Sequence, residues 1–170
     1  MKTNEVIPAL LKASPRSARQ ISLALGKSDG WASKAATETS NPNLGTVAGI
    51  AYAGGGALRV VDADGGQTRF AVVPDGLEDA QAPDAAEAPE AVCVSGTILA
   101  MLAATDKSGR EVARELGHNV QWTSVVSRHR PSPRLGTVAD VAQVAGLRVE
   151  VLGADGSLLG SVEPPCLARG

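Results

Sequence analysis

Side chains able to do covalent or metal chemistry are scarce in this chain. His118 and His129 have no partners at the spacing of a catalytic set. Cys93 and Cys166 form no CxxC pair and cluster with no histidine, so neither a disulfide framework nor a zinc site is expected. The glycine run 54–56 follows an expected helix and precedes an expected strand, the wrong order for a nucleotide loop. The sequence therefore predicts a protein that is not an enzyme and has no metal or small-molecule cofactor.

What remains is the chemistry of hydrogen bonds and charge, and the charge is unevenly distributed. The net charge is −2, but residues 75–95 alone carry six acidic and no basic side chains. Residues 1–74 carry eight basic and five acidic side chains, and residues 96–170 carry eight and seven. Each flank is therefore mildly basic. That balance permits a polyanionic partner without requiring one.

The polar residues belong to a stretch that occurs twice. Residues 10–54 align without a gap onto residues 101–145, always 91 positions apart. The run Leu-Gly-Thr-Val-Ala at 44–48 recurs at 135–139. A repeat with unchanged internal spacing indicates a duplicated fold. Other matched pairs are Leu11/Leu102, Ser17/Ser108, Arg19/Arg110, Leu25/Leu116, Gly26/Gly117, Trp31/Trp122, Ser33/Ser124 and Pro42/Pro133.

Each copy is expected to contain four short helices followed by a β-hairpin. Apolar residues recur at helical spacing, Ser17 can cap the second helix, and Gly26 stands where a helix ends in a left-handed residue. Two segments in which apolar and polar residues alternate, joined by an Asp-Gly turn, predict each hairpin. The expected elements are helices near 6–11, 18–25, 28–37 and 44–53 with a hairpin over 58–73, then helices over 95–104, 109–116, 120–128 and 135–145 with a hairpin over 147–163.

These elements predict two small domains, 1–74 and 95–170, joined by an acidic Ala/Pro-rich linker over 75–94. The linker composition cannot build a core, so an extended, solvated tether is expected. No apolar run is long enough to span a bilayer and no signal segment is evident, so we expect a cytoplasmic protein without a membrane partner.

The segment 19–51 resembles the Cro and lambda-repressor class of helix-turn-helix domains. Members of that class carry an apolar-small pair on the second helix before a Leu-Gly, as in Ile21-Ser22 with Leu25-Gly26, and in Val112-Ala113 with Leu116-Gly117. Pro42 and Pro133 follow at the family's distance. The resemblance covers about residues 5–55 and 95–146. It implies a mainly α fold with β-hairpins: two tandem lambda-repressor-like helix-turn-helix domains, each followed by a hairpin.

The resemblance also implies that the third helix of each copy enters the major groove of DNA. Asn and Gln can bind adenine bidentately, while Arg and Lys bind guanine or phosphate, which makes the second copy the better reader. Trp31 and Trp122 are expected at the edge of the core, one residue before the inward-facing position, with a thymine or inter-copy contact left open. Ser17 and Ser108 would cap their helices and also hold a phosphate there, and Asn43 and Arg134 would contact the DNA backbone. The DNA-contacting residues implied are Ser17, Ser28, Asp29, Gly30, Ser33, Lys34 and Asn43 in the first copy, and Ser108, Asn119, Gln121, Thr123, Ser124, Arg128, Arg130 and Arg134 in the second.

The function expected is that of a sequence-specific transcriptional regulator that binds double-stranded DNA as a covalent pseudo-dimer. The hairpins could join the two copies edge to edge in one four-stranded sheet, or pair with a second chain in a homodimer. The alternative is a protein–protein interaction module that has kept the helix-turn-helix scaffold and lost DNA binding. Asp29, Glu38 and the acidic linker favour this alternative.

Overall fold

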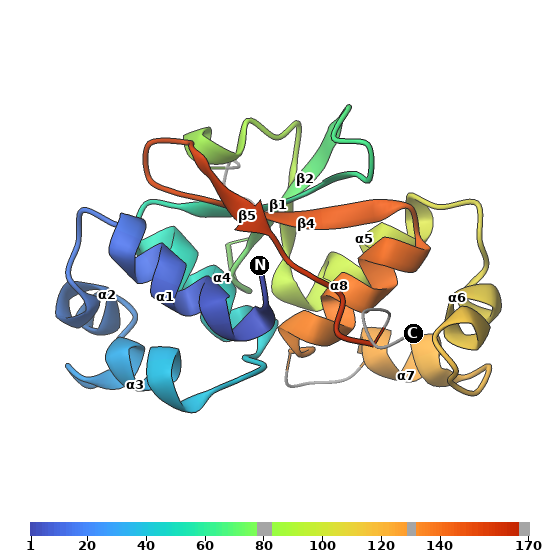
Figure 1. Ribbon diagram of the computed structural model, residues 1–170, viewed down its shortest axis with the longest axis horizontal. Helices are drawn as coiled ribbons and strands as arrows, with labels where there is room; N and C mark the ends of the chain where they lie inside the picture. The colour runs from blue at the N-terminus through green and yellow to red at the C-terminus, as the bar shows by residue number, and fades with distance from the viewer. Residues whose placement is uncertain (78–82, 129–131, 167–170) are drawn as a thin grey trace.

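The helices fall into two sets of four, one from each copy of the repeat. A computed structural model describes residues 1–77, 83–128 and 132–166. The first set lies on the left of Figure 1 and the second on the right, all on one side of a β-sheet. The expected helices are present, with ends that differ by a few residues. They are α1 (Thr3–Ala13), α2 (Ala18–Ala24), α3 (Trp31–Glu38), α4 (Leu44–Ala53), α5 (Thr97–Ala103), α6 (Gly109–Glu115), α7 (Trp122–Arg128) and α8 (Leu135–Val144).

The turn between the second and third helix of each copy is set by a serine and a glycine. Ser17 and Ser108 are the N-caps of α2 and α6, and each side chain accepts a hydrogen bond from the backbone three residues on. Gly26 and Gly117 follow these helices with φ of +70° and +76°, a conformation that side chains disfavour. The predicted caps and left-handed glycines are therefore confirmed.

The strands of both copies form one mixed sheet of five strands, in the order β3-β2-β1-β4-β5. The strands are β1 (Ala57–Asp62), β2 (Thr68–Val73), β3 (Ala91–Cys93), β4 (Leu147–Leu152) and β5 (Leu158–Ser161). The hairpin turns contain Gly65 and Gly156 at positive φ, as the Asp-Gly pairs predict. Antiparallel pairing of β1 with β4 joins the hairpins edge to edge.

The expectation of a mainly α protein with a hairpin after each domain is therefore wrong. Of the described residues, 46% are helical and 17% lie in strands, and these elements are organised around one sheet, so the fold is α/β. The physical reason is that a two-stranded hairpin is marginally stable alone and leaves edges unpaired. Joining β1 to β4 removes two of those edges. It also gives Val60 and Val149, both almost fully buried, a common face against the helices.

Part of the predicted tether is also ordered against the sheet. Residues Asp84–Ala86 form a 3₁₀ turn, η1, in which Ala86 is fully buried. Strand β3 then pairs in parallel with β2, and Val94–Gly96 form a second 3₁₀ turn, η2. The expectation of an extended, solvated chain is wrong for these residues, because small alanines pack closely on Ala57, Ala71 and Leu152 of the sheet. They cover part of the face that the helices leave open (Figure 1).

A pseudo-two-fold axis relates the two copies. In the pairing of β1 with β4, Arg59 lies opposite Glu150, and these residues are 91 positions apart, which is the offset of the repeat. The same holds for the isolated bridge between Asn43 and Arg134. A residue opposite its own equivalent marks the axis, so the axis runs from the centre of the sheet to the starts of α4 and α8.

The core is continuous across this axis. One cluster of buried side chains contains Leu44 and Val60 from the first copy together with Leu135 and Val149 from the second. The matched residues Leu25 and Leu116 are both half-buried against this cluster, as a duplicated fold requires. Among the described residues, every helix is too short or too polar to cross a membrane.

Candidate nucleic-acid interface

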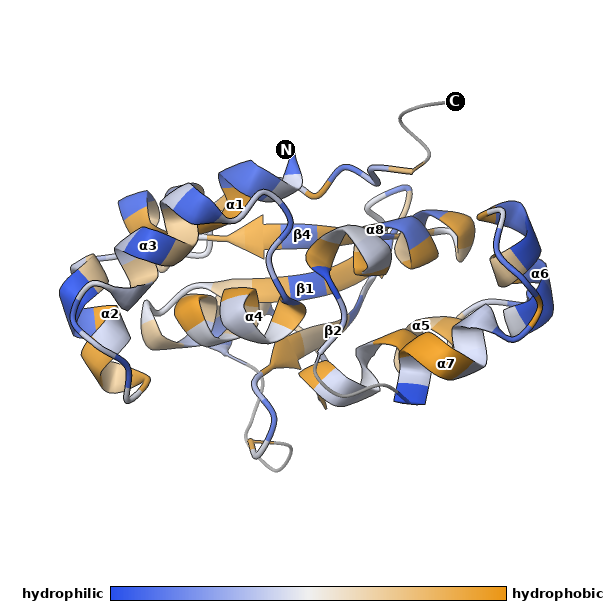
Figure 2. Cartoon of the chain, turned by 90° about the horizontal axis from the view of Figure 1, so that it is seen from below, coloured by the Kyte–Doolittle hydropathy of each residue, from blue (hydrophilic) through white to orange (hydrophobic). Residues whose placement is uncertain are grey.

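Helices α3 and α7 lie on the face opposite the sheet, one on each side of the axis. Figure 1 shows both at the lower edge of the molecule, and Figure 2 views that face directly, with α4 and α8 between them. Each is the second helix of a tightly packed pair. In each helix the second residue is buried, Ala32 in α3 and Thr123 in α7, while most residues of the outer surface are exposed.

A side chain from the preceding turn contacts the ring of the tryptophan that begins each of these helices. The Lys27 Nζ lies 5.6 Å from the ring centroid of Trp31. At the equivalent positions, the rings of His118 and Trp122 stack with centroids 4.2 Å apart and planes 6° from parallel. Both tryptophans are half-buried against the core cluster, so their expected place at its edge is confirmed. Each contact links the turn to the first residue of the helix and favours this orientation of the helix start.

Most residues expected to contact DNA on α3 and α7 are exposed on this face. In the first copy these are Ser28, Asp29, Gly30, Ser33 and Lys34; in the second they are Asn119, Gln121, Ser124 and Arg128. Arg130 and His129 lie outside the described residues. Two of these side chains have contacts of their own. The Asn119 Oδ1 accepts a hydrogen bond from the Gln121 backbone, and Lys34 Nζ lies 4.0 Å from Glu38 in an exposed ion pair.

The expected DNA contact of Thr123 is wrong, because Thr123 is only 4% exposed and cannot reach a base. Its hydroxyl faces the start of α6, where a Cβ on Gly109 would come within 2.6 Å of the Thr123 Oγ1. The repeat contained the signal for this. Thr123 aligns with Ala32, which directly follows Trp31, and the residue after the tryptophan was the one expected to face inward.

At the expected phosphate sites, the backbone N–H and the hydroxyl of Ser17 and Ser108 already make intramolecular contacts. The Ser17 backbone N–H donates to Gln20 Oε1 at 2.9 Å. The Ser108 N–H lies 3.5 Å from Glu111 Oε1, and the Ser108 Oγ lies 3.3 Å from the same oxygen. In the second copy the carboxylate of Glu111 would repel a phosphate. These serines act as helix caps, and that part of the expectation is confirmed.

Two exposed apolar side chains flank Gln121 and were not singled out from the sequence. Val120 and Val125 are each 47% exposed. Gln121 lies between two hollows, one of about 370 Å³ that reaches Ser108 and Arg110 and one of about 480 Å³ that reaches Arg128. The signal was available, because Val120 and Val125 are apolar residues within a segment that was expected to have a polar outer surface. The equivalent positions in the first copy are Asp29 and Lys34, so the exposed surfaces at α3 and α7 differ strongly in charge and polarity.

The centre of the face is formed by contacts that cross the axis. The backbone N–H of Leu44 donates to the Pro133 carbonyl, and that of Leu135 donates to the Pro42 carbonyl, both at 2.8 Å. Asn43 and Arg134 lie here at the N-caps of α4 and α8. Arg134 is exposed, and its Nη1 donates to the Asn41 carbonyl at 3.2 Å. Both expected backbone-contact residues are thus part of the join between the copies.

Side chains from each copy also cap the helix of the other. The Gly45 N–H of α4 donates to Ser132 Oγ at 3.1 Å, and the Gly136 N–H of α8 donates to Asn41 Oδ1 at 2.9 Å. A helix start has free N–H groups that need acceptors, and here the acceptors come from the opposite copy. These four residues fix the angle between the two sets of helices, and hence the relative position of α3 and α7.

Within the described residues, no group of His, Cys, Asp or Glu side chains is arranged to hold a metal ion. Comparison with known proteins adds no assignment, since no family model, curated protein or solved structure matches this chain.

Proposed function

We propose that this protein is a sequence-specific transcriptional regulator that binds double-stranded DNA as a covalent pseudo-dimer. The observation that carries the proposal is the placement of α3 and α7. They are equivalent helices on one face, related by a two-fold axis and held by contacts across it. Helix-turn-helix proteins that bind DNA as two-fold dimers place a pair of such helices in successive major grooves on one side of the duplex. The resemblance of the four-helix units to the Cro and lambda-repressor class supports the same reading.

The two recognition surfaces are unequal, so the proposed target is an operator with two different half-sites. The α7 surface offers Gln121 for hydrogen bonds to a base, Val120 and Val125 for thymine methyls, and Arg128 for guanine or phosphate. The α3 surface offers Lys34, which shares its charge with Glu38, beside the carboxylate of Asp29. We therefore assign most of the sequence preference to α7, and Lys34→Ala should cost less affinity than Arg128→Ala.

The experiment begins with selection of binding duplexes from a random pool, followed by fluorescence anisotropy on selected and random duplexes at several salt concentrations. Gln121→Ala is expected to lose about 1–3 kcal/mol on the selected duplex and little on random DNA. Where Arg128 contacts phosphate, Arg128→Ala is expected to weaken both duplexes and to lower the salt slope by about one unit. Gln143→Ala is the matched control, because Gln143 is exposed near the end of α8, by the sheet. Failure of the wild-type protein to bind any duplex in a salt-dependent manner would remove the proposal.

A second candidate function is a protein–protein interaction module. It is favoured by the exposed Val120, just before α7, and Val125 on α7, and by Asp29 and Glu38, which would lie close to phosphates in a DNA complex. This function replaces the first if the protein binds no duplex and if Val125→Ala weakens binding of a defined protein partner. Gln143→Ala should leave that binding unchanged.

A further inference from the structure

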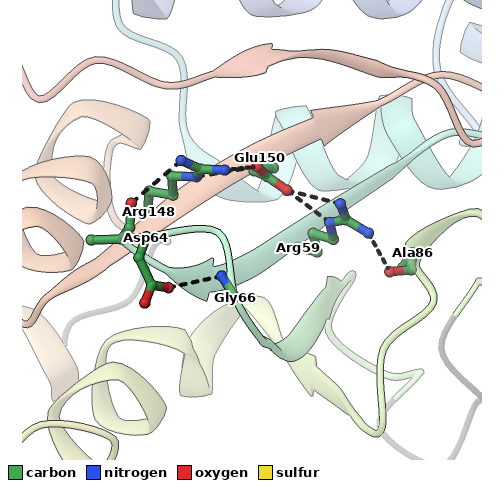
Figure 3. A network of polar contacts seen from close by, with 7 residues as sticks. Arg59, Asp64, Gly66, Ala86, Arg148 and Glu150 are labelled. Atoms are coloured by element: carbon green, nitrogen blue, oxygen red, sulfur yellow. Dashed lines mark hydrogen bonds and ion pairs between the residues drawn. The ribbon is translucent and has the colours of Figure 1, made fainter.

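A buried carboxylate lies at the centre of the sheet, between two guanidinium groups. Glu150 is 2% exposed. Its Oε1 accepts from Nε and Nη2 of Arg59, both at 2.9 Å, and its Oε2 accepts from Nη2 of Arg148 at 2.7 Å. Arg59 also donates to the carbonyl of Ala86 in η1 at 3.2 Å (Figure 3). Every charged group of this network is paired, as a buried carboxylate requires.

The pair formed by Arg59 and Glu150 lies on the axis that relates the two copies. Arg59 and Glu150 are equivalent residues of the two copies, and they face each other across the axis. If either unit, meaning residues 1–77 or 83–166, paired with another copy of itself in this way, its axis residue would face itself. Two first units would place Arg59 against Arg59, and two second units would place Glu150 against Glu150.

The surroundings would compensate the two like-with-like arrangements unequally, and the first unit is the one left without a partner charge. The neighbours of Arg59 on the same face are Ala57, Val61 and Ala71, none of which can neutralise a second guanidinium. Glu150 would keep Arg148 on its own strand, but two carboxylates would still meet in a buried position. Like charges directly opposite each other in a sheet destabilise the pairing, and a buried unpaired charge costs more than an exposed one.

The second contact on the axis points the same way. Asn43 lies opposite Arg134, so the pairing of two second units would also bring two Arg134 side chains together. This contact disfavours only the pairing of two second units, because two Asn43 residues carry no like charge.

We propose that Arg59 and Glu150 make the interface selective, so that the first unit pairs with the second and rejects another copy of itself. Opposite charges at the axis favour the correct pair, while like charges penalise the alternatives. Each chain then presents one α3 and one α7. The proposal does not depend on DNA binding, and it concerns which surfaces assemble rather than what they bind.

The first test uses the intact chain and a charge-reversal cycle measured by urea unfolding. It is run in an Arg148→Ala background, which places at 148 the residue found at the equivalent position 57 and removes a guanidinium that would disturb the exchange. Arg59→Glu and Glu150→Arg are each expected to lower the folding equilibrium constant by about 100-fold or more, and the two together to recover most of that loss. The control is the half-exposed ion pair of Asp62 and Arg69, which lies away from the axis with Arg69 Nε 2.7 Å from Asp62 Oδ1. Reversing one charge of this pair should lower the folding equilibrium constant by about 10-fold or less. No recovery in the exchanged protein would overturn the proposal.

The second test measures selectivity directly. A protease site replaces residues 78–82, the folded protein is cut there, and the pieces are unfolded, mixed and refolded before native mass spectrometry. The wild-type pieces are expected to return only complexes of one first and one second unit. With Arg59→Leu and Glu150→Leu together, complexes of like units should become detectable, because the penalty for them is gone.

Two results of the second test would overturn the proposal. One is like-with-like complexes from the wild-type pieces. The other is strict pairing of unlike units in the Leu/Leu protein, since other residues would then carry the selectivity. If the cut pieces do not reassemble, the charge-reversal cycle on the intact chain decides.

Discussion

At the scale of single residues, the two copies solve the same packing problem with different side chains. In the first copy the Ser22 Oγ accepts from the Ala32 backbone at 2.9 Å and donates to the Ala18 carbonyl at 2.8 Å. In the second copy the equivalents of Ser22, Ala32 and Ala18 are Ala113, Thr123 and Gly109. The polar atom has moved from one helix to the next, and a glycine makes room for it. In each copy the three residues must therefore match one another for this packing to form.

The Gly109→Ala variant tests this set. An added Cβ would lie 2.6 Å from Thr123 Oγ1, and such overpacking typically costs about 1–3 kcal/mol, more than the roughly 1 kcal/mol that alanine gains over glycine in a helix. We therefore expect a lower free energy of unfolding in urea. The matched variant carries Gly109→Ala with Thr123→Ala, the combination found in the first copy. It should be as stable as Thr123→Ala alone or more so. If Gly109→Ala by itself stabilises the protein, the packing explanation is wrong.

At the scale of elements, helices α4 and α8 depend on each other through caps that cross the axis. Their first turns begin with the repeated Leu-Gly-Thr-Val-Ala sequence, in which glycine is a poor helix former. The glycine is explained by close neighbours, which come from the opposite copy at both positions and, at Gly136, also from the C-terminal segment of its own copy. A Cβ on Gly136 would meet Pro165 at 2.8 Å and Asn41 at 3.1 Å, and one on Gly45 would meet Ser132 at 3.1 Å. What looks like a local helix start is a contact between the copies.

Asn41→Ala is expected to lower the free energy of unfolding by about 0.5–2 kcal/mol, the usual cost of a lost N-cap acceptor. The distinctive result is where the change appears. The amide of Gly136, in the other copy, should exchange with solvent faster and shift in the NMR spectrum, because it loses its acceptor. Asn43→Ala is the control, since Asn43 makes no side-chain capping bond. Changes confined to the first copy would contradict the crossed cap.

At the scale of the whole molecule, the two copies share one sheet and one core. Strand β1 pairs along its length with β4, and the buried cluster extends across both sets of helices. Neither copy can unfold without exposing the inner face of the other. The chain is therefore better described as one folding unit with internal two-fold symmetry than as two tethered domains.

We accordingly expect one cooperative unfolding transition, which the two tryptophans can report separately. Trp122→Phe leaves Trp31 to report on the first copy, and Trp31→Phe leaves Trp122 for the second. Once each curve is corrected for the stability change of its substitution, the fluorescence midpoint in urea should coincide with that from far-UV circular dichroism. A fluorescence midpoint well separated from the dichroism midpoint in either variant would mean that the copies unfold independently.

The sequence by itself determined the local structure. The constant offset of 91 residues identified the duplication, the apolar spacing placed the helices, and Gly26, Gly117 and the Asp-Gly pairs placed the turns. Most of the exposed candidates on α3 and α7 could be selected in this way, because side-chain periodicity along a helix decides which face is buried. The same reasoning applied without comparing the copies misplaced Thr123.

Tertiary structure alone decided how the copies meet. The sequence left open whether the hairpins pair with each other or with a second chain. It did not show that β1 pairs with β4 or that Arg59 lies opposite Glu150. Nor does composition show that alanines of an acidic segment fit against a sheet face lined by Ala57 and Ala71. These contacts join residues far apart in sequence, and they form because unpaired strand edges and exposed apolar faces are costly in water. Local patterns record the preference of each segment, whereas the choice of partner depends on which surfaces the rest of the chain leaves uncovered.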